Sequence, residues 1–262
     1  MSTVNKVRIT SPVKTDDVIF LKMEEAAAEL RMLESELSIE LVERRKMTIK
    51  DFFKNDDSPV IVIGQKLPVL YFSADDKIVY HENTMNFKLK RFNKYREVPP
   101  LIDIMPVSLN EQAVIVDATM GMGNDLMLMV QLMKQAEFHA YEINPLIYFV
   151  IKHGIQQYYD IDLTKRIHFH YGSAADEVIA SADVVYVDPM FETTVSQQSG
   201  MQVLSRYTAR HDHDHLMDIV QRARCVVLKA HFRSPLFKRY GFQVTVRRSS
   251  KSHFGILVNK KM

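Results

Sequence analysis

An acidic residue and two glycines stand where a chain could hold a nucleotide-like ligand. Asp117 ends the apolar run at residues 114–116, and Gly121 and Gly123 follow it before a helical stretch begins. Glycine has no Cβ, so the turn can be tight and its backbone can approach a ligand closely. The helix after the turn presents unpaired N–H groups and the positive end of its dipole. The pattern predicts a nucleotide-type site, although an ordinary strand–turn–helix corner has the same outline.

Two further strand ends carry residues that could do chemistry at the same edge of a sheet. Glu142 ends a second strand about 20 residues past the glycines, where a doubly wound fold places the acid that binds ribose hydroxyls. Asp188, Pro189 and Phe191 follow the apolar strand at residues 184–187. Open α/β sheets bind their ligands along this carboxyl edge.

These segments carry a resemblance to a known family. The runs DATMGMGND, EINP and YVDPMF are similar to those of class I S-adenosylmethionine (SAM) methyltransferases, and more narrowly to the RsmJ-type small-subunit ribosomal RNA guanine-N2 methyltransferases. The resemblance covers about residues 114–258, with gaps, and is faint before residue 80. It implies SAM as the cofactor. The residues that it implies for cofactor binding are Asp117, Ala118, Thr119, Gly121, Gly123, Asp125, Glu142, Ile143, Ser173, Ala174 and Asp188.

The resemblance also implies a catalytic segment, Asp188, Pro189 and Phe191. The exocyclic amino nitrogen of guanine or adenine is a poor nucleophile, because its lone pair is delocalised into the ring. Asp188 and the carbonyl of Pro189 can accept hydrogen bonds from that amino group, and Phe191 can stack on a flipped-out base. No metal and no covalent intermediate is needed. Met190 departs from the two prolines of many amino-methyltransferases but agrees with the RsmJ-type pattern.

Three other features leave alternatives open. Ser173 could contact the adenine of the cofactor or cap the helix after it. The run from His211 to His215 has the composition of a metal site, but it precedes a helical pattern, so Asp212 or Asp214 is better interpreted as an N-cap, and we predict no metal. The long polar loop at residues 192–210 is typical of a functional lid or of disorder.

Basic residues indicate a polyanionic partner. Basic and aromatic side chains interleave at residues 81–96, as in proteins that contact phosphates and stack on unpaired bases, although an amphipathic linker helix would show the same pattern. No Asp or Glu follows Asp218, which suits a polyanion or simply a solvated basic face. We expect rRNA or the small ribosomal subunit as partner. The predicted substrate-binding residues are Lys88, Arg91, Arg96, Lys229 and Lys251.

The periodicity predicts two domains. A small α/β domain with a basic linker is expected at residues 1–98, and a methyltransferase domain at residues 99–262, with Pro99 and Pro100 at the junction. Strands and helices alternate in the second half, which predicts a mostly parallel, doubly wound, Rossmann-like sheet. Two consecutive strands near residues 241–259 would form the antiparallel hairpin that, by resemblance, ends a class I methyltransferase sheet.

Composition narrows the class of protein. The 262 residues carry a net charge of only +2, and Cys225 is the only cysteine, so no internal disulfide can form. No apolar run approaches the ~18 residues that span a bilayer, and we expect a cytoplasmic protein without membrane contact. We therefore expect a SAM-dependent methyltransferase that acts on an exocyclic amino group in RNA, with guanine N2 of small-subunit rRNA favoured. The alternatives are a catalytically idle RNA-binding module on the same fold and a nicotinamide-dependent oxidoreductase. Leu126 at the third position of GxGxxG argues against the latter.

Overall fold

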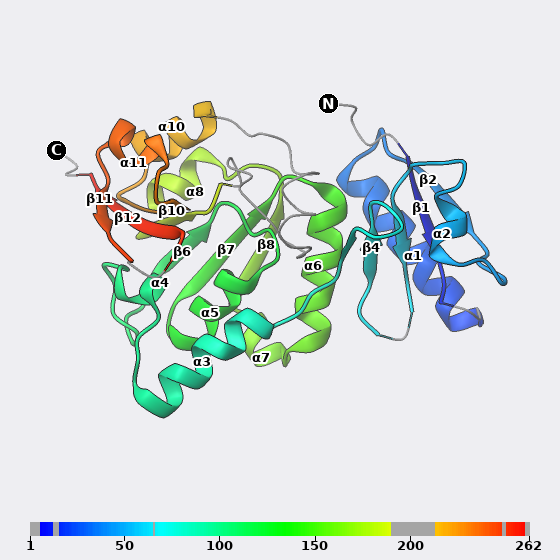
Figure 1. Ribbon diagram of the computed structural model, residues 1–262, viewed down its shortest axis with the longest axis horizontal. Helices are drawn as coiled ribbons and strands as arrows, with labels where there is room; N and C mark the ends of the chain where they lie inside the picture. Colours follow the sequence, from blue (N-terminus) through cyan, green and yellow to red (C-terminus); the bar gives the residue numbers. More distant parts are fainter. Residues whose placement is uncertain (1–5, 13–15, 65, 190–212, 248–249, 260–262) are drawn as a thin grey trace. The chain divides into compact units, whose positions relative to one another are not determined.

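The computed structural model describes residues 6–12, 16–64, 66–189, 213–247 and 250–259 (Figure 1). Within them the chain forms two compact units. The first contains the chain up to His81 together with Asn144–Asp160, and the second contains Glu82–Ile143, Ile161 onward and the C-terminal segment. This division differs from the predicted boundary after residue 98, because helix α3 (Asn83–Tyr95) joins the second unit and α6 (Pro145–Tyr158) joins the first.

The first unit is built on a five-stranded sheet with the strand order β2-β1-β3-β4-β5. Its strands are β1 (Lys6–Thr10), β2 (Ser38–Val42), β3 (Val60–Val62), β4 (Val69–Tyr71) and β5 (Lys77–Ile78). Strand β1 pairs in parallel with β2 and β3, and the remaining pairs are antiparallel. The chain also forms α1 (Asp17–Leu33) and the short α2 (Ile49–Phe52) in this unit.

Local capping explains where these helices begin. Asp16 is the N-cap of α1, and its carboxylate accepts a hydrogen bond from the Ile19 N–H at 2.8 Å. Thr48 and Asp51 form a reciprocal capping box at the start of α2. Glu29 on α1 binds both Lys152 and His153 of α6, at 2.9 and 2.7 Å, which explains why α6 belongs to this unit.

The second unit contains a seven-stranded sheet with the order β11-β12-β10-β9-β6-β7-β8. Its strands are β6 (Val114–Asp117), β7 (Glu137–Glu142), β8 (Ile167–Tyr171), β9 (Val184–Val187), β10 (Cys225–His231), β11 (Gln243–Thr245) and β12 (Ser252–Val258). The five strands from β10 to β8 in this order are parallel, and β12 pairs antiparallel with both β10 and β11. The predicted fold class, a mostly parallel sheet with an antiparallel C-terminal hairpin, is confirmed.

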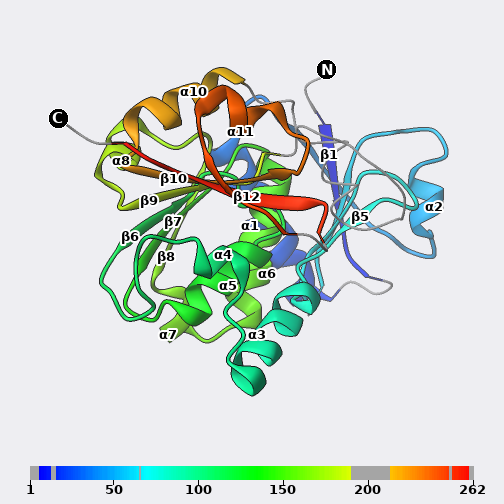
Figure 2. The same cartoon turned by 60° about the vertical axis from the view of Figure 1, so that its left-hand side comes forward.

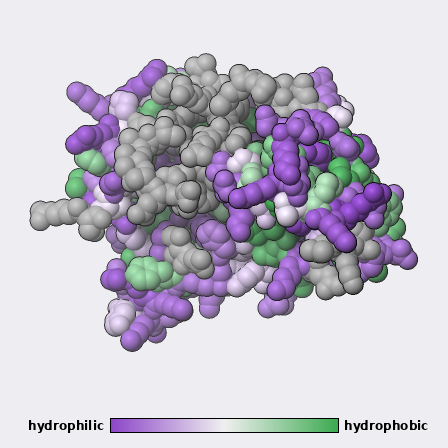
Figure 3. Space-filling view, turned by 45° about the vertical axis from the view of Figure 1, so that its right-hand side comes forward, coloured by the Kyte–Doolittle hydropathy of each residue, from purple (hydrophilic) through white to green (hydrophobic). Residues whose placement is uncertain are grey.

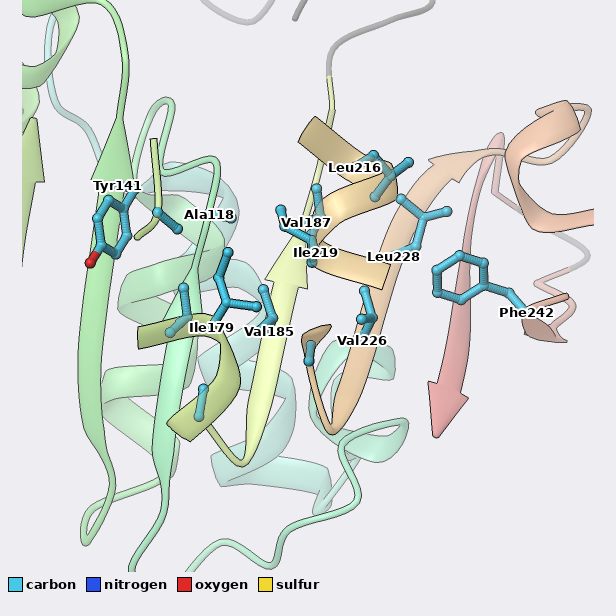
Figure 4. Packing of buried hydrophobic residues seen from close by; sticks show 14 of the residues in the cluster. Ala118, Tyr141, Ile179, Val185, Val187, Leu216, Ile219, Val226, Leu228 and Phe242 are labelled. Atoms are coloured by element: carbon cyan, nitrogen blue, oxygen red, sulfur yellow. The ribbon is translucent and has the colours of Figure 1, made fainter. Parts of the chain in front are cut away.

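Helices cover both faces of this sheet (Figures 1 and 2). Helices α3 and α5 (Asn124–Leu132) lie on one side, and α8 (Asp176–Ser181) and α10 (His213–Arg222) lie on the other. The chain also contains α4 (Pro100–Asp103), α7 (Ile161–Thr164) and α11 (Pro235–Tyr240). Figure 4 shows Ile179 of α8 and Ile219 of α10 directed toward Val185 and Val226 on the strands. All four side chains are buried, so this face is a packed apolar layer.

The surface carries both hydrophilic and hydrophobic side chains. On the face drawn in Figure 3, hydrophobic surface is interrupted by hydrophilic side chains. Every helix among the described residues is too short or too polar to cross a bilayer.

Candidate active site at the carboxyl edge of the sheet

Strand alternation places four polar side chains on the face that carries α5. Asp117 is the register partner of Tyr186, and Val227 on β10 is the next partner in the same row. Side chains two residues apart on a strand share a face, so Asp188 and Lys229 follow on the same side. Their neighbours one residue away, such as Val185 and Val226, belong to the apolar cluster under α8 and α10.

Asp125, in the first turn of α5, is the centre of an ion-pair network on this face. Its Oδ1 accepts a hydrogen bond from Lys88 Nζ of α3 at 2.9 Å. Its Oδ2 accepts from the Tyr186 hydroxyl at 2.9 Å and from Lys229 Nζ at 2.7 Å. The same Lys229 ammonium donates to Asp188 Oδ2 at 2.6 Å. One lysine therefore joins the predicted catalytic carboxylate to a predicted cofactor-binding carboxylate.

Burial and charge act against each other in this network. Burial raises the pKa of Asp188, and the adjacent Lys229 offsets part of that rise. Burial would raise the pKa of Asp125 as well, but Lys229 and Lys88 hold it far below its usual range. Burial alone would lower the pKa of Lys229, whereas its two carboxylate partners raise it, so Lys229 stays cationic at neutral pH. These opposing effects are typical of functional sites.

Asp117 lies in a different environment. It is 1% exposed, and burial raises its pKa to about 8, against an ordinary value of 3.8. Its Oδ1 accepts a hydrogen bond from the Thr119 N–H at 3.0 Å. The Thr119 hydroxyl in turn accepts from the Asp188 N–H at 2.7 Å, which ties the turn after β6 to the end of β9.

The glycine turn has the backbone that its sequence predicts. Gly121 and Gly123 have φ values of 52° and 70°, in the left-handed region that side chains with a Cβ rarely adopt. The Gly121 N–H donates to Glu142 Oε2 at 3.1 Å, and Glu142 is 5% exposed. Gly123 is the N-cap of α5 and has no side chain to cap it. The turn and the acid of the second strand therefore meet, as a cofactor site of this type requires.

Two buried hydrogen-bond acceptors near the glycine turn fit SAM. Glu142 is a buried carboxylate, the group that accepts hydrogen bonds from ribose hydroxyls. Asn124 Oδ1, at the start of α5, is buried and has no hydrogen-bond partner among the described residues. A buried polar atom without a partner is costly, and a donor from a ligand would satisfy it.

The third strand ends beside Glu142. The Gly172 N–H after β8 donates to the Glu142 carbonyl at 2.9 Å, and Gly172 has a φ of 108°. Ser173 is exposed and Ala174 is buried. Helix α8 begins at Asp176 with Ala175 as its N-cap, so the alternative that Ser173 caps this helix is wrong. Ala118 and Ile143 lie at the ends of β6 and β7, in the same edge of the sheet.

The predicted substrate-binding residues divide into two groups. Lys88 and Lys229 are part-buried in the network around Asp125. Arg91, Arg96 and Lys251 are exposed, and the Arg91 Nε donates to Glu97 at 2.8 Å. Pro189 is half-buried after β9.

Several predicted features fall outside the described residues: Phe191, Met190, the loop at 192–210, His211 and Asp212. Helix α10 begins at His213, so Asp214 lies inside the helix and is not its N-cap. Within the described ranges, no three His, Cys, Asp or Glu side chains are grouped to share a metal ion. Sequence reasoning missed Tyr186, because it reads as one more apolar residue in the strand VVYV.

The sheet order and the acid–glycine edge define a class of protein, an α/β fold with a nucleotide-type site at its carboxyl edge. Residues 73–251 match the sequence profile of a family described as "Putative SAM-dependent methyltransferase". The chain belongs to this family, and its cofactor is SAM.

Three individual proteins show what this chain is similar to. A Bacillus subtilis (strain 168) protein, described as uncharacterized protein YpiP, is 27% identical over 241 residues, 87% of this chain and 92% of that protein. The crystal structure of the SAM-dependent methyltransferase NGO1261 from Neisseria gonorrhoeae matches with a TM-score of 0.60 at 16% identity, covering 97% of each chain. A predicted O-methyltransferase, Atu636 from Agrobacterium tumefaciens, matches with a TM-score of 0.45 at 12% identity, covering 62% of this chain and 80% of that one.

Proposed function

We propose that this methyltransferase modifies an exocyclic amino group of a base in RNA, and that the base is a guanine, methylated at N2, in small-subunit rRNA. The observation that carries the proposal is Asp188, followed by Pro189, at the carboxyl end of β9 with one carboxylate oxygen held by Lys229. SAM would supply an electrophilic methyl group when bound, so the protein must position and activate the amino nitrogen of the substrate base.

Asp188 is suited to activate an amino nitrogen. A carboxylate accepts hydrogen bonds from an NH₂ group and favours the pyramidal nitrogen whose lone pair is available. Because Lys229 binds Oδ2, the carboxylate is held in one orientation. The raised pKa of Asp188 also makes it a better acceptor for the proton that the nitrogen releases as the new N–C bond forms.

RNA is favoured as the substrate class by charge. The chain has no acidic residue after Asp218, and α3 exposes Lys90, Arg91 and Lys94 beside the exposed rings of Phe87 and Tyr95. Cations follow phosphates and exposed rings stack on unpaired bases. The restriction to guanine N2 and to the small subunit rests on the resemblance of the YVDPMF segment to RsmJ-type enzymes. A cytoplasmic location accords with such a substrate.

The two alternative functions, an idle RNA-binding module and a nicotinamide-dependent oxidoreductase, fit the chain less well. An idle RNA-binding module would bind RNA but transfer no methyl group, and the carboxylate–lysine pair at the end of β9 argues for retained chemistry. A nicotinamide-dependent oxidoreductase is disfavoured by the family to which the chain belongs.

The test is methyl transfer from labelled SAM to rRNA from cells that lack the gene, offered as free RNA and as small-subunit particles. Wild type should label one of these, and nucleoside analysis should identify N2-methylguanosine. Asp188→Asn should lose nearly all transfer, whereas Asp176→Asn, which alters an exposed carboxylate on α8, should retain it. Equal transfer by Asp188→Asn and wild type would falsify the catalytic assignment. Label in a different nucleoside would overturn the choice of guanine N2.

A further inference from the structure

An exposed aromatic ring lies in the turn that follows β10, which we name the β10 turn and define as His231–Ser234. Phe232 is 44% exposed. The guanidinium of Arg233, the next residue, lies over the Phe232 ring at 5.0 Å from its centroid. The ring centroid of His231, the preceding residue, lies 4.5 Å from the Phe232 centroid. An exposed aromatic ring with a cation beside it can stack on a flat apolar group of a ligand while the cation contacts an anionic group of the same ligand.

The β10 turn is held by backbone hydrogen bonds. The Phe232 N–H donates to the Lys251 carbonyl at 2.9 Å, and the Ser234 N–H donates to the His231 carbonyl at 2.8 Å. The Arg233 N–H also donates to His231 Nδ1 at 3.3 Å. The ring is therefore presented on a fixed backbone, which lowers the entropy lost when a ligand binds it.

The charge around this ring is positive and not neutralised. Arg233, Arg247 and Lys251 have no acidic partner within 4 Å among the residues that the structure describes. By contrast, Arg222 and Arg224, near the opposite end of β10, pair with Asp176 and Asp183. A surface of this kind fits a polyanion with flat apolar groups.

The β10 turn is close to Asp188. Lys229, whose Nζ lies 2.6 Å from Asp188 Oδ2, is two residues before His231 on the same strand. At roughly 3.3 Å per residue, the turn begins about 7 Å further along β10. Strands β9 and β10 are parallel, so both end at the same edge of the sheet.

We propose that the β10 turn is a docking surface for an unpaired nucleotide of the RNA substrate, on whose base Phe232 stacks while Arg233 and Lys251 contact adjacent phosphates. The inference rests on the proposed function and adds to it the class of substrate, a single-stranded or splayed-out segment beside the methylated base. Phe254 on β12 is only 3% exposed, with the Arg247 guanidinium 5.5 Å from its ring centroid, so its ring is not available to stack on a base.

A binding measurement separates this surface from catalysis. Fluorescence anisotropy would follow a fluorescein-labelled, unstructured 12-nucleotide RNA with wild type, Phe232→Ala and Phe232→Trp. The matched control is Phe20→Ala, which removes the same side chain at 45% exposure from α1 in the first unit. We expect Phe232→Ala to weaken binding by about 5- to 150-fold, the effect of one stacked base, while Phe232→Trp and Phe20→Ala bind like wild type.

Charge is tested by the salt dependence of the same titration. Arg233→Gln should reduce the log–log salt slope by about 0.7, the value for one phosphate of a single strand, and Arg224→Gln at the other end of β10 should not. Phe232→Ala should weaken binding at unchanged slope. The surface is wrong if Phe232→Ala binds within twofold of wild type, or if heparin shows the same loss with Phe232→Ala as the RNA does. These binding titrations do not depend on methyl transfer, so the two proposals can fail separately. If Phe232 contributes to RNA binding but the separate rRNA assay shows no methyl transfer, the proposed function is refuted and this surface stands.

Discussion

The Lys229 ammonium group contacts two carboxylates at once, Asp125 and Asp188, and this shared contact determines how the edge of the sheet can work. With Asp188 Oδ2 engaged by the lysine, the carboxylate cannot rotate freely. Under the proposed function we expect Lys229 to act as a positioning residue, which influences the substrate through Asp188. The resemblance had indicated Lys229 for direct substrate binding, a role that stays a prediction.

We expect Lys229→Met to lower methyl transfer through kcat, on the order of 100-fold, with little change in KM for SAM, because a misplaced acceptor damages the chemical step. The pKa of Asp188 should also rise further, since burial would no longer be offset by the lysine. The acidic limb of the pH–rate profile should therefore move to higher pH. Titration of the Asp188 Cγ signal by ¹³C NMR, assigned with Asp188→Asn, measures this shift without any substrate.

The matched control is Lys88→Met. Lys88 contacts Asp125 on the far side of the network and makes no contact with Asp188 within 4 Å among the described residues. The other charged groups that face Asp188, namely Asp125 and Asp117, remain in both variants. A larger shift of the Asp188 pKa in Lys88→Met than in Lys229→Met would contradict the positioning role.

The buried carboxyl group of Asp117 should make the stability of the protein depend on pH. Its pKa in the folded protein is about 8, above its ordinary value of 3.8. A carboxyl group with a raised folded-state pKa favours folding fully below 3.8 and loses that contribution as pH rises toward 8. Asp117→Asn keeps an acceptor for the Thr119 N–H and removes the titration.

The free energy of unfolding of Asp117→Asn should therefore rise relative to that of wild type between pH 4 and pH 8, by about 3–5 kcal/mol. Urea unfolding at both pH values gives the two differences. A constant gap between the proteins would mean that folding does not raise the pKa of Asp117.

Local geometry is predictable from the sequence where a local rule applies. Gly121 and Gly123 are predictable as a turn because glycine adopts the positive φ that a tight turn before a helix requires, and Glu142, whose carboxylate accepts from the Gly121 N–H, is predictable as the acid that ends the next strand about 20 residues later. Tyr186 and the Lys88–Asp125 pair were not predictable. Their contacts join segments 37 to 61 residues apart, and no local pattern marks which polar groups will meet there.

At the scale of elements, α3 contributes side chains both to the part-buried network around Asp125 and to the exposed surface. Lys88 faces inward to Asp125 on α5, while Phe87 and Tyr95 are 62% and 64% exposed. The alternative reading of residues 81–96, an amphipathic linker with its aromatic rings packed inward, is therefore wrong for these two rings. RNA binding by the exposed side of α3 stays a prediction.

We expect the triple variant Lys90→Gln, Arg91→Gln, Lys94→Gln to reduce the log–log salt slope of RNA binding by about 2, since each phosphate contact contributes about 0.7–0.9. Lys88 is left intact because its loss would disturb the active-site network. The control removes the same charge from the first unit, with Arg31→Gln, Lys46→Gln and Lys50→Gln. Equal slopes for the two triple variants would show that the basic residues of α3 are merely solvated and do not contact phosphates.

The element order itself followed from periodicity. Alternating apolar strands and amphipathic helices predict a parallel sheet, and the last two strands, which follow one another closely in the sequence, predict the final hairpin that β11 and β12 form. The grouping of α6 with the first unit was not predictable. It depends on Glu29 binding Lys152 and His153, more than 120 residues away, and on Gly154, where a Cβ would lie 2.4 Å from the Tyr80 Cβ.

At the scale of the whole molecule, charge is nearly balanced but unevenly distributed. The net charge is +2, whereas the chain after Asp218 contains basic residues and no acidic ones. Under the proposed function we expect this basic region to attract a polyanion locally, while the low net charge limits non-specific binding to nucleic acid.

Methylation of guanine N2 in small-subunit rRNA through Asp188 can be tested in cells. Nucleoside mass spectrometry would be applied to small-subunit rRNA from cells that lack the gene, complemented with wild type, Asp188→Asn or Asp176→Asn. We expect one N2-methylguanosine to be lost without the gene, restored by wild type and by Asp176→Asn, and not restored by Asp188→Asn. An unchanged content of N2-methylguanosine in cells without the gene, or its full restoration by Asp188→Asn, would show that the proposed function is wrong.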